Sequence, residues 1–188
     1  NTSNVMYMDS MFSGCSSLDN LSILNFDISN VISFENCFKH CSSLISIIFD
    51  NYKTNNLENM KNMFYGCKSL ILIDISSFNT SKVFDMEGLF SGCNKLEMIN
   101  LDNFRTNNVI NMDYMFQGCK TITSLILDNF DTSKVTTMKY MFSECTNLGE
   151  LELYNFKLSN VKNMEYMFYG CKILTSINLP NMTESSVI

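Results

Sequence analysis

A cysteine recurs every 26 residues along almost the whole 188-residue chain. A phenylalanine stands three residues before each of these cysteines, and a leucine or isoleucine stands three residues after it. A repeat of this length cannot bury its apolar face alone, whereas stacked repeats bury one continuous core. The spacing therefore predicts a solenoid of seven repeats without insertions, formed as a single domain over residues 1–188. The recurring cysteines are Cys15, Cys41, Cys67, Cys93, Cys119, Cys145 and Cys171.

The first half of each repeat has the apolar spacing of a short helix. In one repeat, Val109, Met112, Met115, Phe116 and Cys119 follow steps of three and four, which is typical of one face of a helix. A Ser or Asn before each such segment is suited to cap the first helical turn. The glycine that usually precedes the cysteine fits a helix end that needs a positive φ angle. We therefore expect one short helix in every repeat.

The second half of each repeat predicts a β-strand. Apolar residues alternate with other residues in Leu125-Ile126-Leu127 and in Leu151-Glu152-Leu153, a period of two that gives a strand one buried face. Strands that alternate with helices predict a right-handed coil. The fold class is therefore expected to be α/β, a right-handed solenoid of seven strand–helix repeats with a parallel sheet on its concave face.

The repeat motif resembles that of a known family. The segments Met112-Asp113-Tyr114-Met115-Phe116-Gln117-Gly118-Cys119 and Leu125-Ile126-Leu127-Asp128-Asn129-Phe130-Asp131-Thr132-Ser133 are similar to repeats of BspA-like leucine-rich-repeat surface proteins. The likeness extends over essentially the whole chain. It implies a leucine-rich-repeat solenoid, a location at the cell surface or outside the cell, and a role in adhesion or in binding host or matrix molecules.

Charge and composition exclude some partners. The formal net charge is −6 and the isoelectric point is near 4.7, so the chain repels phosphate backbones and nucleic acid is not an expected partner. The sequence contains no basic run that would attract anionic lipid. It also lacks an apolar stretch of about 18–20 residues, so no membrane span is expected in this segment.

The cysteines allow three readings. A buried ladder of small apolar thiols is the favoured one. Disulfides between neighbouring turns are conceivable because stacked turns bring Cα atoms within bonding range, although an odd number of cysteines cannot pair fully. A zinc site is disfavoured by the long spacing and by the single histidine. We therefore expect no metal and no cofactor.

An asparagine precedes the aromatic residue after the strand in most repeats. An asparagine at one place in every turn can satisfy backbone groups of the neighbouring turn, so a structural ladder along the solenoid is expected. Its members are Asn25, Asn51, Asn103, Asn129, Asn155 and Asn181.

No residue pattern indicates catalysis. His40 replaces a turn glycine, and no arrangement of Ser or Cys around it indicates a nucleophile that it could activate. The carboxylates are scattered at positions outside the core, which is typical of a solvated face. The chain has no glycine-rich phosphate loop and no H-E-x-x-H or G-x-S-x-G motif, so we expect that it is not an enzyme.

The outward positions of the strands are the predicted partner-binding surface. Solenoids usually bind through such positions, and exposed apolar patches commonly mark protein contacts. The alternative is that some of these residues turn inward or are covered by a flanking segment. The predicted binding residues are Ile45, Ile48, Asp50, Ile71, Leu72, Asp74, Met98, Asp102, Ile126, Asp128, Glu152 and Tyr154.

Two functions remain open on these observations. The first is a non-catalytic, surface-displayed module that binds a protein or another surface macromolecule. The second is a structural block that stacks end to end with itself or with further repeats into a filament or surface assembly. The sequence opens and closes at the same phase of the repeat, so we expect a fragment of a longer array.

Overall fold

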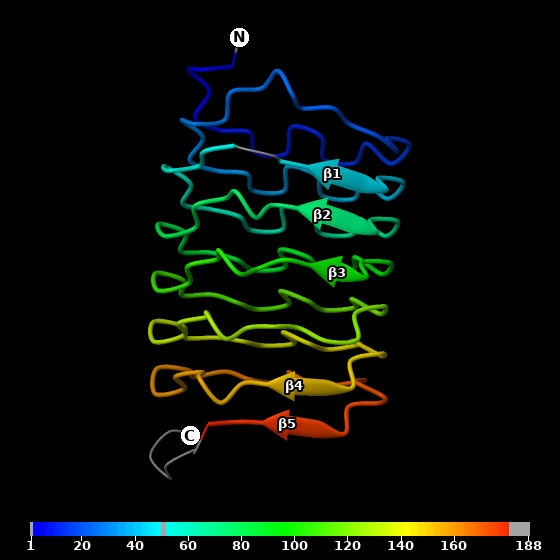
Figure 1. Ribbon diagram of the computed structural model, residues 1–188, viewed down its shortest axis with the longest axis vertical. Helices are drawn as coiled ribbons and strands as arrows, with labels where there is room; N and C mark the ends of the chain where they lie inside the picture. Colours follow the sequence, from blue (N-terminus) through cyan, green and yellow to red (C-terminus); the bar gives the residue numbers. More distant parts are fainter. Residues whose placement is uncertain (1, 50–51, 181–188) are drawn as a thin grey trace.

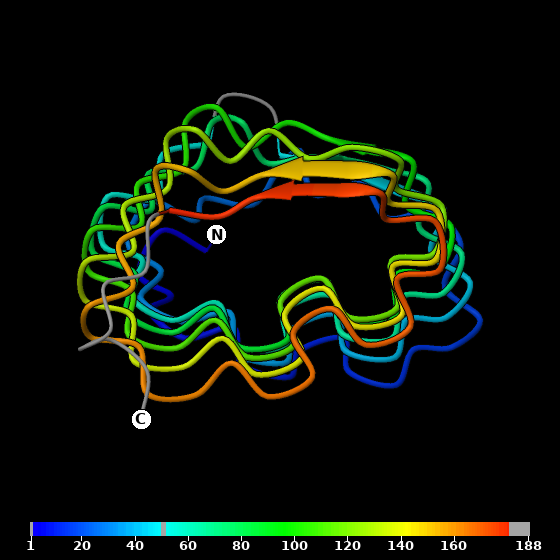
Figure 2. The ribbon, with the colours of Figure 1, turned by 90° about the horizontal axis from the view of Figure 1, so that it is seen from below.

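A computed structural model describes residues 2–49 and 52–180 as a regular stack of coils. Successive coils lie one below another from the N-terminus to the C-terminus (Figure 1). Seen along the stack, the coils superpose, with a flat side that carries the strands and a scalloped side made of turns (Figure 2). The predicted repeat solenoid is confirmed.

The strands are short and all pair in parallel. They are β1 (Ser46–Ile48), β2 (Leu72–Asp74), β3 (Met98–Ile99), β4 (Glu150–Glu152) and β5 (Ser176–Asn178). β1, β2 and β3 form one sheet, and β4 and β5 form another. Each residue pairs with its equivalent in the next repeat, as Ile47 does with Ile73. The cause is the constant repeat length, which brings equivalent residues of successive coils side by side.

Within the described ranges the chain contains no helix, so the predicted α/β class is wrong. Two consecutive β-turns take the place of the expected helix. Met115 N–H donates to the carbonyl oxygen of Met112 (3.4 Å), and Cys119 N–H donates to that of Phe116 (3.1 Å). The first and last residues of both turns are buried, while the central residues are partly exposed. The inward positions therefore follow the same i, i+3, i+4, i+7 spacing as one face of a helix, which explains the wrong prediction.

Backbone conformation also rules out a helix in this segment. Tyr114 and Gly118, the third residues of the two turns, have φ angles of 59° and 69°. A positive φ at this place is typical of type II turns and is not compatible with a right-handed helix. The same turn position holds His40 (φ 60°) and Glu144 (φ 59°) in other repeats. The glycine next to the cysteine thus serves a turn rather than a helix end.

Alternate amides of the turn segment bond to the following repeat. Tyr114 N–H donates to Lys139 O (2.8 Å), Phe116 N–H to Met141 O (2.9 Å) and Gly118 N–H to Ser143 O (2.8 Å). The amides between these bond locally within the turns. Backbone groups that a helix would satisfy internally therefore link neighbouring coils, and a ladder of hydrogen bonds runs along the turn side.

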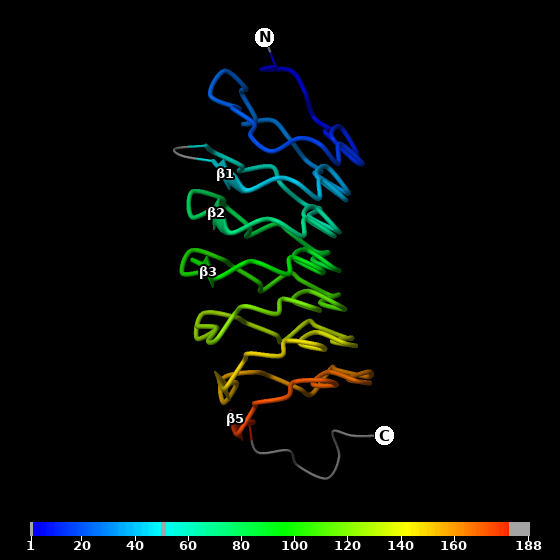
Figure 3. The same ribbon diagram turned by 90° about the vertical axis from the view of Figure 1, so that its right-hand side faces the viewer.

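The sheet does not lie on a concave face. Figure 3 shows the stack from the side, and the stack bows slightly. The side that carries the strands follows the outside of this bow, and the turns follow the inside (Figure 3). The predicted placement of the sheet on the concave face is therefore wrong. We call the flat side the strand face, defined as the exposed side chains of residues 45–48, 71–76, 97–102, 123–128 and 149–154.

Equivalent side chains stack in columns inside the solenoid. The rings of Phe38, Phe64, Phe90, Phe116 and Phe142 lie face to face, with centroids 5.4–6.0 Å apart between neighbours. These rings are almost fully buried. Removing such area from water stabilises the fold by about 25 cal/mol per Å² of apolar surface. The core is therefore continuous along the stack, and successive repeats each contribute side chains to it.

A column of buried threonines links the repeats at the corner after the strand. Arg105 N–H donates to Thr80 Oγ1 (2.7 Å), and Thr80 Oγ1 donates to Arg105 O (3.1 Å). Thr132 makes the same pair of bonds with Lys157. Each of these hydroxyls satisfies two backbone groups of the next coil that would otherwise be buried without a partner.

Replacing Thr80 by Val tests this column, because valine keeps the shape of threonine and removes the hydroxyl. Thr80→Val leaves the N–H and C=O groups of Arg105 without these partners. We expect the free energy of unfolding to fall by about 1–3 kcal/mol. Urea denaturation measures the change, with Thr80→Ser as the control that keeps the hydroxyl and loses less. A Val variant as stable as the parent would contradict this role.

Candidate functional site

The strand face carries a group of exposed apolar side chains from successive coils. Met98 is 73% exposed, Ile126 is 69% exposed and Ile48 is 51% exposed. Ile45, Ile71, Leu72 and Tyr154 are also exposed large hydrophobic residues. Their neighbours in sequence, such as Ile47 and Ile73, point inward and are buried, because successive side chains of a strand alternate between its two faces.

The predicted acidic members of this surface also face outward. Asp102, Asp128 and Glu152 are exposed, and Asp74 is half-buried. Asp50 lies outside the described residues. The structure thus brings the described members of the predicted patch to one side of the stack. Glu97 and Glu150 lie on the same side, and the sequence analysis did not include them.

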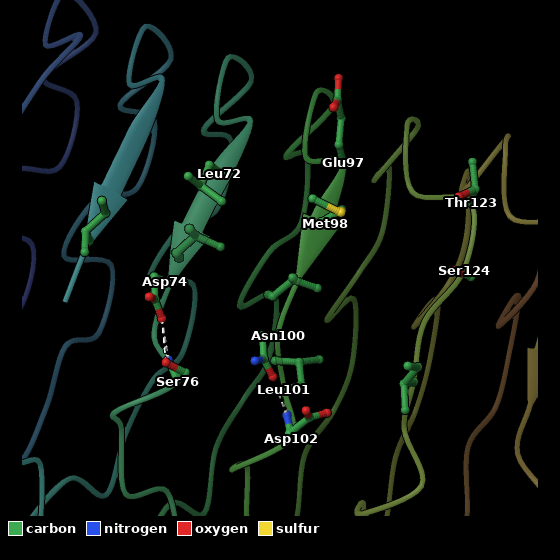
Figure 4. A pocket seen from close by; sticks show the side chains of 14 residues that line it. Leu72, Asp74, Ser76, Glu97, Met98, Asn100, Leu101, Asp102, Thr123 and Ser124 are labelled. Carbon is green, nitrogen blue, oxygen red and sulfur yellow. Dashed lines mark hydrogen bonds between the residues drawn. The ribbon is translucent and has the colours of Figure 1, made fainter. Parts of the chain in front are cut away.

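A depression of about 620 Å³ lies on the strand face across β2, β3 and the following coil (Figure 4). Leu72, Met98 and Ile126 give it apolar walls. Asp74 and Asp102 lie at its lower end in this view, near Ser76 and Asn100. The depression therefore combines apolar contact area with carboxylates at its margin.

The depression coincides with a break in the sheet. Residues 124–126 occupy the place of a strand between β3 and β4, yet they form none. The predicted strand at Leu125-Ile126-Leu127 is therefore wrong, although Ile126 still points outward between two buried leucines.

Backbone hydrogen bonds show the same break. Ile71 N–H donates to Ile45 O (2.9 Å) and Gly149 N–H donates to Thr123 O (3.3 Å), bonds that join equivalent positions of successive repeats. Among the described residues, no backbone bond joins 97–101 to 123–127. The hydroxyl of Thr121 instead donates to Leu96 O (2.7 Å). The strand sides of these two coils are thus not joined by backbone hydrogen bonds.

The charge of the strand face has one sign. The five ranges that define it contain Asp74, Glu97, Asp102, Asp128, Glu150 and Glu152, and they contain no Lys, Arg or His. The Asp74 carboxylate accepts hydrogen bonds from Ser76 Oγ (2.7 Å) and Ser76 N–H (3.0 Å). These bonds lower the pKa of Asp74, so its carboxyl group is ionised at neutral pH.

The predicted cysteine column lies inside the solenoid, on the turn side of the core. The Cys93 thiol donates to Phe64 O and the Cys119 thiol donates to Phe90 O, both at 3.3 Å. Cys41, Cys67 and Cys145 are buried in the same way, Cys171 is half-buried and Cys15 is exposed. All eight cysteines of the chain are unpaired, including Cys37, whose pKa burial raises to about 12. Within the described residues, no group of His, Cys, Asp or Glu is arranged to hold a metal ion.

The predicted asparagines lie at the corner after the strand. Asn103 Nδ2 donates to Ser76 O (2.9 Å). Asn129 Nδ2 donates to the carbonyl oxygens of Leu101 and Asp102, at 2.8 and 2.9 Å. Asn155 makes equivalent bonds to the preceding repeat, and Asn25 lies exposed at its position. Asn51 and Asn181 lie outside the described residues.

Sequence reasoning missed the threonine column, which has the same bridging role. Its signal was a Thr directly before a Ser or Asn at the same place in four successive repeats, at Thr54, Thr80, Thr106 and Thr132. His40, on the turn side, lies with its ring edge-on to Tyr65 at a centroid distance of 5.3 Å. His40 is therefore remote from the depression on the strand face.

A family model matches residues 1–98, 35–125 and 85–187. The family is described as "Mycoplasma protein of unknown function, DUF285". This chain belongs to the DUF285 family. No curated protein matches the sequence.

Solved structures similar to this DUF285 chain are leucine-rich-repeat proteins of bacteria. One from T. pallidum has 21% identity and a TM-score of 0.47, with 73% of this chain and 71% of that chain covered. One from Bacteroides ovatus has 20% identity and a TM-score of 0.45, with 80% of this chain and 41% of that chain covered. A leucine-rich cell surface protein from Faecalibacterium prausnitzii has 14% identity and a TM-score of 0.34, with 94% of this chain and 70% of that chain covered.

The described part of this DUF285 chain contains no helix that could cross a membrane.

Thiol alkylation tests the position of the cysteine column. Iodoacetamide reacts with the thiolate form of cysteine. Burial raises the pKa of Cys93 and Cys119 far above that of a free thiol, so both stay protonated even near pH 8.5. We expect iodoacetamide to modify Cys15 in the folded chain and to reach Cys93 and Cys119 only after unfolding. Peptide mass spectrometry at increasing times measures each site. Rapid labelling of Cys119 in the native state would contradict its burial.

Proposed function

We propose that this chain is a non-catalytic recognition module of a protein displayed at the cell surface or outside the cell. Its strand face binds a protein partner or a host or matrix macromolecule. The observation that supports this most is the group of exposed apolar side chains formed by Ile48, Leu72, Met98 and Ile126 on one face. Exposed apolar side chains gathered on one face are more often contact surfaces than solvated ones.

The architecture supports the same role. Hydrogen bonds and stacked side chains connect each coil to the next, so the outward side chains are held on a rigid frame. A rigid surface loses little conformational entropy when it binds. The strand face varies between repeats while the core columns do not, as Ile48, Asp74, Asn100 and Ile126 at one outward position show. Such variation lets one scaffold present a specific surface.

Substitutions on two faces test this proposal. The double variant Met98→Ser and Ile126→Ser removes exposed apolar area from the strand face. The control, Phe84→Ser and Ile110→Ser, removes two exposed apolar residues that lie outside that face, 45% and 47% exposed. Binding of each protein to immobilised collagen, fibronectin and laminin is measured by surface plasmon resonance. We expect at least tenfold weaker binding for the strand-face variant and an unchanged affinity for the control, because central apolar residues dominate most interfaces.

Equal affinity of the parent and the strand-face variant, or no binding of the parent to any of the three proteins, would contradict adhesion through this face. Light scattering of the parent across the same concentrations checks the competing function. A size that grows with concentration would support end-to-end assembly instead.

A further inference from the structure

We propose that the strand face takes an extended, cationic peptide segment of a partner protein, which docks along β3 at the break between β3 and residues 123–127. This inference rests on the proposed function, since it names the chemistry of the partner for the same surface. Three observations carry it: the apolar depression, the missing strand pairing and the single sign of charge.

The depression is shaped for side chains that enter at alternate positions of a strand. Leu72, Met98 and Ile126 come from three successive coils and line its walls, and the half-buried Ile99 lies among them. Alternate residues of an extended segment point to the same side. One or two apolar side chains of the segment can therefore enter the depression while the intervening side chains point away from it.

The break leaves main-chain groups available for pairing. The edge of β3 that faces Thr123 makes no backbone bond to that coil, whereas its other edge pairs with β2 in register Leu72 to Met98. Side-chain bonds bridge both ends of this break, from Thr121 Oγ1 to Leu96 O (2.7 Å) and from Asn129 Nδ2 to Leu101 O (2.8 Å). The partner segment therefore lies over the break on the strand face, and it meets the unpaired main-chain groups of β3 from the outer side in addition to making apolar contact.

Charge selects a cationic segment. Asp74 and Asp102 lie at one end of the depression, Glu97 lies at the other end, and Asp128 and Glu152 lie beyond the break. The strand-face ranges contain no cationic side chain; beyond them, Arg105 donates to the main-chain oxygen of Asp102 (3.5 Å). Lys or Arg in the partner would meet these carboxylates, whereas the strand face of a second copy would place carboxylate against carboxylate. The same charge opposes acidic peptides and polyanions.

A display library of short random peptides, selected against the whole folded chain, tests the proposal. We expect the selected peptides to be enriched in Lys or Arg next to apolar residues. Synthetic versions should bind at least tenfold more weakly to the double variant Asp74→Asn and Asp102→Asn. The matched control, Asp27→Asn and Glu58→Gln, removes two exposed carboxylates outside the strand face and should bind as the parent does. Asp27 accepts bonds from Ser29 as Asp74 does from Ser76, so the local turn chemistry is matched.

The outcomes separate this inference from the proposed function. One outcome would overturn the cationic partner and leave the recognition role intact. In it, the selected peptides show no cationic enrichment and bind the Asp74→Asn and Asp102→Asn variant normally, but they lose binding to the Met98→Ser and Ile126→Ser variant. Peptides whose binding no strand-face variant changes would overturn both. Weaker binding of the cationic peptides at higher salt, absent for Lys-to-Gln versions of them, would support the inference.

Discussion

The backbone hydrogen bond from one repeat to the next is the interaction on which the rest of this structure depends. On the turn side, every second amide donates to the following coil, as Phe116 does to Met141. Because these bonds join equivalent positions, they hold the phenylalanine, cysteine, threonine and asparagine columns in register together. An insertion in one repeat would shift all columns at once, which is a physical reason for the constant length of 26 residues.

The period of the sequence predicted the stack and its core, because burial repeats with the same step as the apolar residues. It did not distinguish a helix from a pair of β-turns. Met112, Met115, Phe116 and Cys119 face inward in either conformation. The stronger signal was the residue at the third place of each turn, such as Gly88 and Gly92, four positions apart and both at positive φ. A helix tolerates such a residue at its end but not four positions earlier as well.

The outward residues of the strand face followed from the alternation within each strand. Asp74, Asp102, Asp128 and Glu152 could be named from the sequence, whereas Glu97 and Glu150 were missed. The break after β3 could not, because Leu125-Ile126-Leu127 has the same pattern as segments that do pair. Strand pairing depends on the spacing between two coils, and here no backbone bond joins residues 97–101 to residues 123–127. The recognition surface thus combines a predictable alternation with a local departure from regular stacking. That departure opens the apolar depression between acidic margins.

Scalar couplings across hydrogen bonds, measured by NMR on the isotope-labelled chain, test the central claim most directly. Such couplings identify the carbonyl carbon that accepts the bond from a given amide nitrogen. The structure predicts couplings from the amides of Tyr114, Phe116 and Gly118 to the carbonyls of Lys139, Met141 and Ser143 in the next repeat. Couplings from Phe116 to Met112, four residues earlier in the same repeat, would show a helix and contradict the turn ladder that joins the coils.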